Sequence, residues 1–295
     1  FMTVFRSEIN EFIFQLFSTS NYYKTIHQNL GATINSINNG DLKKFRFSFP
    51  SQNEQQKIAS FLSSVDKKLD QLQKKKELLE QYKKGMMQKI FKQEIRFKDE
   101  HGKDFPKWEE KKLKDSLKSY RLGGNYSNSD KVTEKPLIKM GNLGRGKITL
   151  SKIQYIEEGV SADNEDLIQK DDLFFNTRNT LELVGKVAIW RNELPKAYYN
   201  SNLMRLRFDN NSFMNYRLNS YDGIKGLKRY ATGTTSVAAI YTRDLLKLKL
   251  KIPCVEEQSK IANFLSALDE KIDLVATEIE KASHFKKGLL QQMFV

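Results

Sequence analysis

Residues 50–91 of the chain align without a gap to residues 253–294, at a constant offset of 203 residues. Eighteen of the 42 aligned positions are identical, and they include a motif Glu-Gln-x-Lys-Ile-Ala-x-Phe-Leu-Ser that begins at Glu54 in the first copy and at Glu257 in the second. A match of this length is not expected by chance, so it predicts an internal duplication. Both copies must then adopt the same local structure.

Each copy has the pattern of one long helix. Apolar residues recur at alternating steps of four and three, from Ile58 onwards and from Ile261 onwards. This spacing is typical of the narrow seam of a coiled coil, and a helix of this length would extend roughly 55 Å. No other segment offers a matching seam, so we expect the two copies to pack against each other. The alternative is that each helix pairs with another chain.

Shorter patterns surround the two helices. Residues 42–50 and 245–253 alternate apolar and basic side chains up to a proline, which predicts an edge strand before each helix. Residues 105–245 contain strand-like runs at 137–140, 147–150, 183–190 and 203–208 and a helical pattern at 212–228, which predicts a mixed α/β domain. Residues 1–41 resemble only the last third of that domain, so we expect the first copy to be truncated.

Composition excludes several classes of protein. Lys and Arg number 50 against 36 Asp and Glu, a net charge of +14, and a strongly basic chain most often has an anionic partner such as nucleic acid. One cysteine and three separated histidines exclude a disulfide scaffold and make a metal site improbable. No apolar run approaches the ~20 residues that cross a bilayer, so we expect a cytoplasmic protein with no membrane contact.

No catalytic constellation is evident in the sequence. The glycine-rich residues 141–148 nearly match a phosphate-binding loop, but Ile148 replaces the hydroxyl that would bind magnesium. Polar loops remain, such as Asn-Thr-Arg-Asn-Thr at 176–180. Arg and Asn side chains read base edges, although ordinary turn chemistry is the alternative for any single loop. The candidate DNA-contacting residues are Lys139, Asn142, Arg145, Arg178, Asn179, Asn202, Thr234 and Thr235.

The repeated Pro-x-x-x-Glu-Gln-x-Lys-Ile-Ala-x-Phe-Leu motif, the Lys-Lys-Gly near each helix end and the sequence Phe-Pro-Lys-Trp at 105–108 resemble the specificity subunit of type I restriction–modification enzymes. Residues 138–143 and 171–178 resemble its target-recognition domains. This resemblance implies α/β (α+β) recognition domains separated by two long conserved helices that form an antiparallel coiled coil. The domains would be a truncated first recognition domain (1–49), a first helix (50–95), a second recognition domain (96–252) and a second helix (253–295).

The resemblance also implies function and partners. Each recognition domain reads one half of a bipartite site in double-stranded DNA, and the subunit itself is not catalytic. It docks two methyltransferase subunits and, through them, the restriction subunits. S-adenosylmethionine, ATP and magnesium are expected on those partners, and no cofactor is expected here. Phe61, Leu62, Phe264 and Leu265 are candidates for holding the methyltransferase, with burial at the domain–helix junction as the alternative.

Two other readings stay open. One is an enzyme with an unrecognised site. The other is a basic coiled-coil protein that binds nucleic acid without sequence preference, through phosphate contacts alone.

Overall fold

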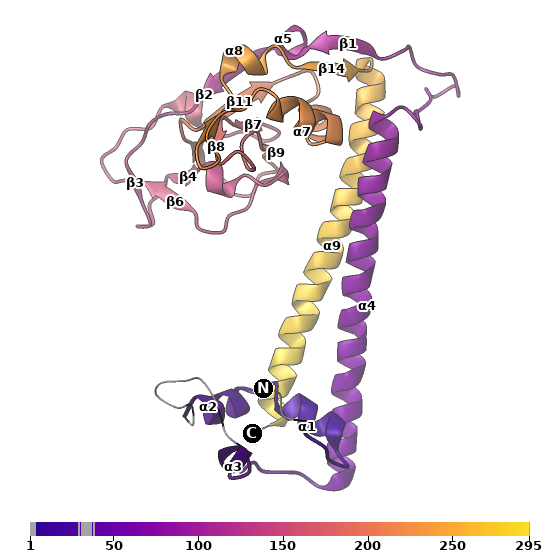
Figure 1. Ribbon diagram of the computed structural model, residues 1–295, viewed down its shortest axis with the longest axis vertical. Coiled ribbons are helices and arrows are strands. Elements are labelled where there is room, and N and C mark those ends of the chain that lie inside the picture. Colours follow the sequence, from indigo (N-terminus) through magenta and orange to yellow (C-terminus); the bar gives the residue numbers. More distant parts are fainter. Residues whose placement is uncertain (1–3, 29, 31–36, 38, 295) are drawn as a thin grey trace. The chain divides into compact units, whose positions relative to one another are not determined.

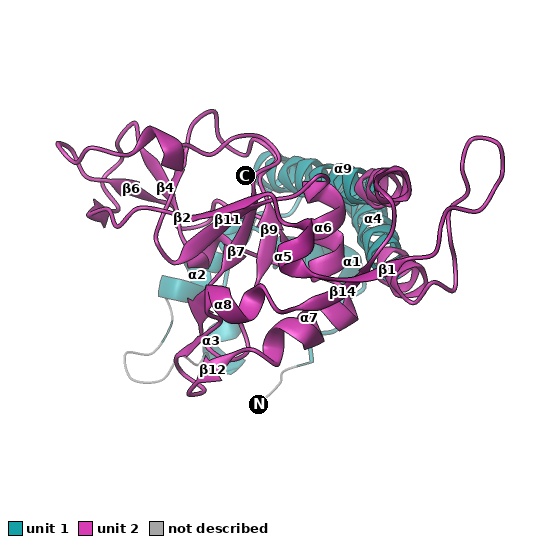
Figure 2. Ribbon diagram, turned by 90° about the horizontal axis from the view of Figure 1, so that it is seen from above, with its two compact units in different colours: residues 1–81, 269–295 teal, residues 82–268 magenta. Residues whose placement is uncertain are grey.

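The computed structural model of the chain describes residues 4–28, 30, 37 and 39–294. It divides into two compact units, residues 1–81 with 269–295 and residues 82–268 (Figure 2). Helices α4 (Gln52–Phe91) and α9 (Val255–Met293) each contribute to both units (Figure 1). The two predicted long helices are therefore confirmed, and each begins two residues after a proline, which cannot donate the backbone hydrogen bond that a helix interior needs.

A five-stranded sheet forms the centre of residues 82–268. Its β5 and β9 pair in parallel, and its other pairs are antiparallel. Side chains alternate between its faces, so Leu173 and Phe175 lie in one apolar cluster and Phe174 lies in another. Both faces are buried, which explains why all four residues of β7 are buried. The strand order is β2 (Ser119–Leu122), β11 (Leu203–Arg207), β7 (Leu173–Asn176), β9 (Val187–Ile189) and β5 (Gly146–Lys147).

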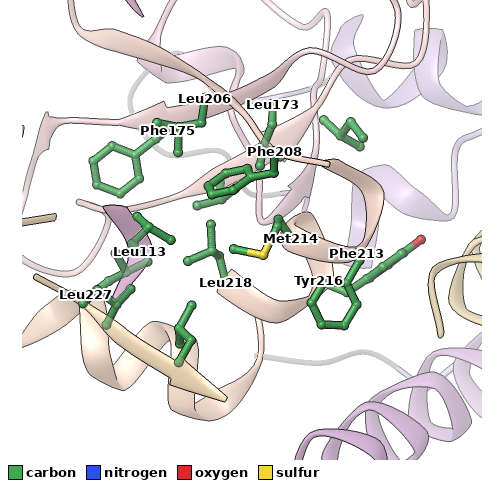
Figure 3. Packing of buried hydrophobic residues seen from close by; sticks show 14 of the residues in the cluster. Leu113, Leu173, Phe175, Leu206, Phe208, Phe213, Met214, Tyr216, Leu218 and Leu227 are labelled. Atoms are coloured by element: carbon green, nitrogen blue, oxygen red, sulfur yellow. The ribbon is translucent and has the colours of Figure 1, made fainter. Parts of the chain in front are cut away.

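Helices α6 (Asn211–Leu218) and α7 (Tyr221–Lys228) supply the core on one face of this sheet, where Phe213, Met214 and Leu227 pack with Leu206 (Figure 3). The sequence predicted helical structure around residues 212–228 without placing a break within it. Two helices form instead because the hydroxyl of Ser220 accepts a hydrogen bond from the backbone N–H of Gly223, at 3.2 Å, and so caps a new helix start.

The opposite face packs against a four-stranded sheet in the order β10 (Tyr198–Tyr199), β4 (Pro136–Ile138), β6 (Gln154–Ile156) and β3 (Asn128–Ser129). A separate three-stranded sheet has the order β12 (Thr232–Gly233), β13 (Ala238–Ala239) and β8 (Arg178–Asn179). The short connecting helices are α5 (Leu113–Ser116), α8 (Thr242–Leu245), and the 3-10 turns η1 (Met140–Asn142) and η2 (Asn164–Asp166).

Of the two predicted edge strands, only the second forms. Strand β14 (Lys249–Ile252) pairs antiparallel with β1 (Glu109–Lys112). In the first copy, helix α3 (Asn39–Leu42) is followed by residues 43–50 without strand structure. A strand needs a hydrogen-bonded neighbour, and no strand in the described part of the chain pairs with residues 43–50.

The other unit consists of α1 (Asn10–Leu16), α2 (Ser20–Gln28), α3, the first part of α4 and the last part of α9. Its core joins Phe12 of α1 to Leu62 of α4 and Leu290 of α9. In residues 82–268 the contact is reversed, because Ile90 near the end of α4 packs with Ile261 near the start of α9. In each unit the two helices therefore run in opposite directions within one chain.

A polar cluster interrupts the apolar contact between these helices in the first unit. The Lys286 ammonium lies 2.5 Å from the Asp66 carboxylate, which also accepts a hydrogen bond from the Gln15 amide at 2.8 Å. The cluster connects α1, α4 and α9. Lys286, which lies on the apolar seam of α9, therefore has an acidic partner. No helix among the described residues is long and apolar enough to cross a membrane.

Candidate nucleic-acid interface

Five of the eight predicted DNA-contacting residues lie on adjoining loops of residues 82–268. Strand β8, which is Arg178 and Asn179, pairs with β13 of the β12–β13 hairpin. The backbone carbonyl of Asn202 accepts a hydrogen bond from the backbone N–H of the residue before β8, at 3.1 Å. The carbonyl of Thr235, on the same hairpin as Thr234, accepts one from the loop after β8, also at 3.1 Å.

The hairpin that carries the two threonines is tightly built. Gly233 has a φ of +124°, and a Cβ at this position would lie 2.3 Å from the carbonyl oxygen of Val237. The Thr234 hydroxyl accepts a hydrogen bond from the Val237 N–H at 3.2 Å and lies 3.2 Å from the Ser236 hydroxyl. The hydroxyl of Thr234 is thus used by hydrogen bonds within the turn, whereas the side chain of Thr235 is exposed to solvent.

Three polar groups on this surface have no partner elsewhere in the described chain. They are the exposed guanidinium of Arg178, the amide of the half-buried Asn202 and the hydroxyl of Thr235. The Asn179 amide keeps its N–H groups available, because only its oxygen is used, by the N–H of Thr180 at 2.8 Å. A guanidinium and amides held on ordered loops are the groups that make paired hydrogen bonds to base edges.

Arg145 extends the same surface. Its guanidinium reaches the carbonyl oxygen of Glu182, in the loop after β8, at 3.5 Å. Loss of water around the side chain lowers the pKa of Arg145, but an arginine keeps its charge at neutral pH. This residue therefore adds positive charge beside the loop that follows β8.

Lys139 and Asn142 belong to a neighbouring turn and are occupied by internal hydrogen bonds. The Lys139 ammonium donates to Asn128 at 2.9 Å and to Gln154 at 2.7 Å. Asn142 is buried, and its amide joins the backbone of Lys139 to that of Thr149. The prediction that Asn142 contacts DNA is wrong for this reason: its side chain closes the turn and does not reach the surface.

A buried ion pair and a tyrosine–carboxylate hydrogen bond order the part of the fold around β11 and η2. The Arg205 guanidinium lies 3.3 Å from the Asp172 carboxylate and donates to the carbonyl of Glu165 at 2.9 Å. The Tyr126 hydroxyl donates to Asp166 at 2.6 Å, and burial together with this carboxylate raises the pKa of Tyr126 to about 12. These bonds fix β11, the strand that directly follows Asn202.

Sequence reasoning missed two exposed apolar residues beside the polar groups. Leu181 is 39% exposed in the loop after β8, and Val237 is 56% exposed at the tip of the hairpin. Apolar side chains next to base-reading groups can contact the methyl group of thymine. Their only signal in the sequence was an isolated apolar residue inside a polar loop, which is too common to be informative.

The four residues predicted to bind a methyltransferase differ in exposure. Leu62 and Leu265 are fully buried in the two helix contacts, which agrees with the alternative of burial and leaves neither side chain available at the surface. Phe264 is half-buried, with its ring 5.7 Å from that of Phe97. Phe61 is 43% exposed.

Residues 82–268 thus combine a mixed α/β fold with the basic, polar loops described above. Among the described residues, no group of three or more His, Cys, Asp or Glu is placed to hold a metal ion. The family model described as "Type I restriction modification DNA specificity domain" matches residues 1–81 and 106–284. The chain belongs to this family.

Curated relatives and solved structures agree with that assignment. The putative type I restriction enzyme MjaX specificity subunit of Methanocaldococcus jannaschii is 29% identical over 214 residues, 70% of this chain and 49% of that protein. The MjaVIII specificity subunit of the same organism is 26% identical over 276 residues, 89% of this chain and 64% of that protein. The chain thus spans about half to two-thirds of the length of these relatives.

The crystal structure of a type I restriction–modification S subunit from M. genitalium has the same fold, with a TM-score of 0.63 at 18% identity, over 97% of this chain and 72% of that one. A second solved structure, from work on complex assembly and conformational transition of the type I R-M system, matches with a TM-score of 0.56 at 15% identity. The match covers 98% of this chain and 73% of that one.

Proposed function

We propose that this chain reads one half of a bipartite sequence in double-stranded DNA, as the specificity subunit of a type I restriction–modification complex. The observation that carries the proposal is the set of unpartnered polar groups on Arg178, Asn202 and Thr235, which adjoining loops bring to one basic surface. Asn179 and Arg145 complete this surface. Lys139 stays a weaker candidate, because its ammonium would have to exchange internal hydrogen bonds for contacts to DNA.

The proposed division of the chain follows the duplication. Residues 1–49 are the last part of a first recognition domain, and residues 96–252 are the second domain. Residues 50–95 and 253–295 are the two helices of an antiparallel coiled coil. The two matches to the family model support a duplication, because they end at residues 81 and 284 and 284 − 81 = 203 is the offset of the sequence repeat.

The proposed partners follow from membership of the family. Two methyltransferase subunits dock on the chain, and the restriction subunits bind through them, in the cytoplasm where chromosomal DNA is accessible. The chain itself contributes no catalytic group and no cofactor site. S-adenosylmethionine, ATP and magnesium act on the partner subunits.

Co-expression with the methyltransferase subunit of the same operon, followed by mapping of N6-methyladenine across the host genome, tests the proposal. We expect one methylated motif, and we expect Arg178→Ala to relax or abolish it, since a bidentate base contact supplies about 1–3 kcal/mol of discrimination. Arg229→Ala is the matched control, because it removes the same charge from another exposed position of the same unit. A stable complex that methylates no defined motif would refute the proposal.

The same experiment separates two versions of the proposal. A bipartite asymmetric motif requires two different recognition domains, whereas a palindrome requires two copies of the domain at residues 96–252. Sequence-independent binding through phosphates, the alternative function, predicts a steep salt dependence with equal affinity for all sequences. The ordered, uncharged amides of Asn179 and Asn202 favour base reading over that alternative, because they add nothing to phosphate neutralisation.

A further inference from the structure

The three-stranded sheet of β12, β13 and β8 has one face buried and one face turned to solvent. Along β13 and the residues on either side of it, Ala238 and Ile240 are buried, whereas Val237 is exposed and Ala239 is half-buried. Because side chains alternate along a strand, Val237 and Ala239 point away from the core. Ala239 is the direct partner of Arg178 on β8, so the exposed Arg178 side chain belongs to the same outer face.

The two segments stay paired beyond these short strands. At one end, the backbone N–H of Ile240 donates to the carbonyl of the residue before β8, at 2.9 Å, and at the other end the N–H of Leu181 donates to the carbonyl of Thr235, at 3.1 Å. Val237 lies within this paired region, two residues before the direct partner of Arg178. It is therefore the diagonal neighbour of Arg178, and such neighbours on one face are about 7–8 Å apart.

Small side chains surround Arg178 and Val237 on this outer face. Thr232 of β12 pairs with Ala239, which pairs in turn with Arg178, so the three residues form one row across the sheet. The hydroxyl of Thr232 donates to the carbonyl of Ala239 at 3.4 Å, which holds this side chain against the strands. The row therefore leaves room for a flat partner to approach the guanidinium and the valine closely.

A sheet face that carries a guanidinium beside an aliphatic side chain matches the major groove of DNA. The groove is about 12 Å wide and admits a β-ribbon, a guanidinium there makes paired hydrogen bonds to O6 and N7 of guanine, and an apolar side chain contacts the C5-methyl group of thymine. Successive bases of one strand are about 3.4 Å apart, so the separation of Arg178 and Val237 corresponds to about two base-pair steps. The minor groove offers no such match, because thymine presents no methyl group there.

We propose that the outer face of this three-stranded sheet enters the major groove of the half-site, where Arg178 reads a guanine and Val237 reads the methyl group of a thymine about two base pairs away. The inference rests on the proposed function as a DNA-reading subunit, and it adds the groove, the reading element and two of the bases. Val237 carries no polar group, but contact with a methyl group removes its exposed surface from water and so favours thymine over the other bases.

Base analogues that alter only the major groove test this arrangement. The chain is co-purified with its methyltransferase subunit, and its affinity for a duplex containing the methylated motif is measured by fluorescence titration. Uracil replaces each thymine in turn and removes only the C5-methyl group, whereas 7-deazaguanine replaces each guanine in turn and removes only the N7 acceptor. We expect uracil at one position to weaken binding about three- to tenfold, and 7-deazaguanine to have an effect of similar size about two base pairs away.

Two substitutions assign these effects to residues. Val237→Ala should remove the effect of uracil at its position and preserve that of 7-deazaguanine, and Arg178→Ala should do the reverse. Weakened complexes are measured at lower salt, where phosphate contacts still hold the DNA. Val132→Ala is the matched control and should leave both effects unchanged, because Val132 is an exposed valine between β3 and β4 of the same unit.

Several results would overturn the proposal. If the complex selects its motif but uracil has no effect at any thymine, the thymine contact does not exist, while the proposed function stands. A uracil effect that persists in Val237→Ala belongs to another residue. Sensitive positions more than about three base pairs apart exclude a single sheet face as the reader. A complex without any motif preference would refute the proposed function and this inference together.

Discussion

Glu54 and Glu257 occupy the same position of the repeat, and the structure predicts that the same substitution affects them very differently. Glu257 has no exposed surface and accepts three hydrogen bonds, two from Arg96 and one from Trp108. Glu54 is exposed and has no side-chain partner among the described residues. Glutamine keeps the size of the side chain, so the comparison isolates charge and hydrogen bonding.

The magnitude follows from the geometry at Glu257. Each carboxylate oxygen faces at least one donor, so a glutamine at this position must turn its own N–H₂ toward Arg96 or Trp108 in either orientation. A buried donor without an acceptor costs about 1–3 kcal/mol, and the charged partner increases this cost. We expect Glu257→Gln to lower the free energy of unfolding by about 2–4 kcal/mol. Glu54→Gln should change it by less than about 0.5 kcal/mol.

Urea unfolding followed by tryptophan fluorescence measures the difference. The two tryptophans, Trp108 and Trp190, both lie in residues 82–268, so the signal reports on the unit that contains Glu257. For a domain of this size, 1 kcal/mol corresponds to about 2–4 °C in Tm, which gives a second readout. Equal effects of the two substitutions, or a loss below about 1 kcal/mol for Glu257→Gln, would refute the assignment of Glu257 as the side chain that anchors Arg96 and Trp108 to α9.

Three further outcomes are expected. Arg178→Ala should change the relative affinities of the chain for different DNA sequences, measured by competition titration. If the guanidinium also contacts phosphate, the slope of log K against log salt concentration should fall by about one unit as well. Gly233→Ala should distort the β12–β13 hairpin, because the added Cβ would lie 2.3 Å from a carbonyl oxygen at a φ of +124°, and amide hydrogen exchange should report faster opening there. Tyr126→Phe should cost about 1–2 kcal/mol near neutral pH through loss of the hydrogen bond to Asp166, whereas Tyr199→Phe, which removes a buried hydroxyl without a partner in the described chain, should be neutral or stabilising. Because the pKa of Tyr126 is raised to about 12, its stabilising effect is complete below pH 10 and is lost as the pH rises toward 12, which alkaline unfolding curves of wild type and Tyr126→Phe would detect.

The long helices could be predicted from the sequence because their signal is local. A seam of apolar residues at steps of three and four specifies a helix whatever surrounds it. Helix α9 begins and ends two residues inside the expected range of 253–295, and α4 begins two residues and ends four residues inside the expected range of 50–95. The strand at residues 42–50 has an equally regular pattern but does not form, since a strand depends on a neighbour that the pattern does not contain. Local order was predictable, and pairing between distant segments was not.

The candidate site shows the same division. Arg178, Asn202 and Thr235 were chosen for their chemistry, and that choice could not tell them from Asn142, which has the same chemistry but closes a turn inside the fold. A side chain is free to contact DNA only if its polar groups do not already form hydrogen bonds with nearby backbone. The three-dimensional structure shows which side chains meet this condition, and the sequence does not. Thr234 is intermediate, because the hairpin uses its hydroxyl while its neighbour is left free.

The two copies of the repeat show the difference between local sequence pattern and contacts with distant segments within one chain. Two positions at the helix starts have the same burial in both copies: Leu62 and Leu265 are both fully buried, and Ala59 is 4% exposed where Ala262 is 3% exposed. Positions that face away, such as Glu54 and Glu257, are identical in sequence and opposite in environment. The inward positions depend on a partner helix that each copy always has, whereas the outward positions depend on the segment that reaches them. The same helix sequence therefore fixes the burial of its inward positions but not that of its outward ones, as the opposite exposure of Glu54 and Glu257 shows.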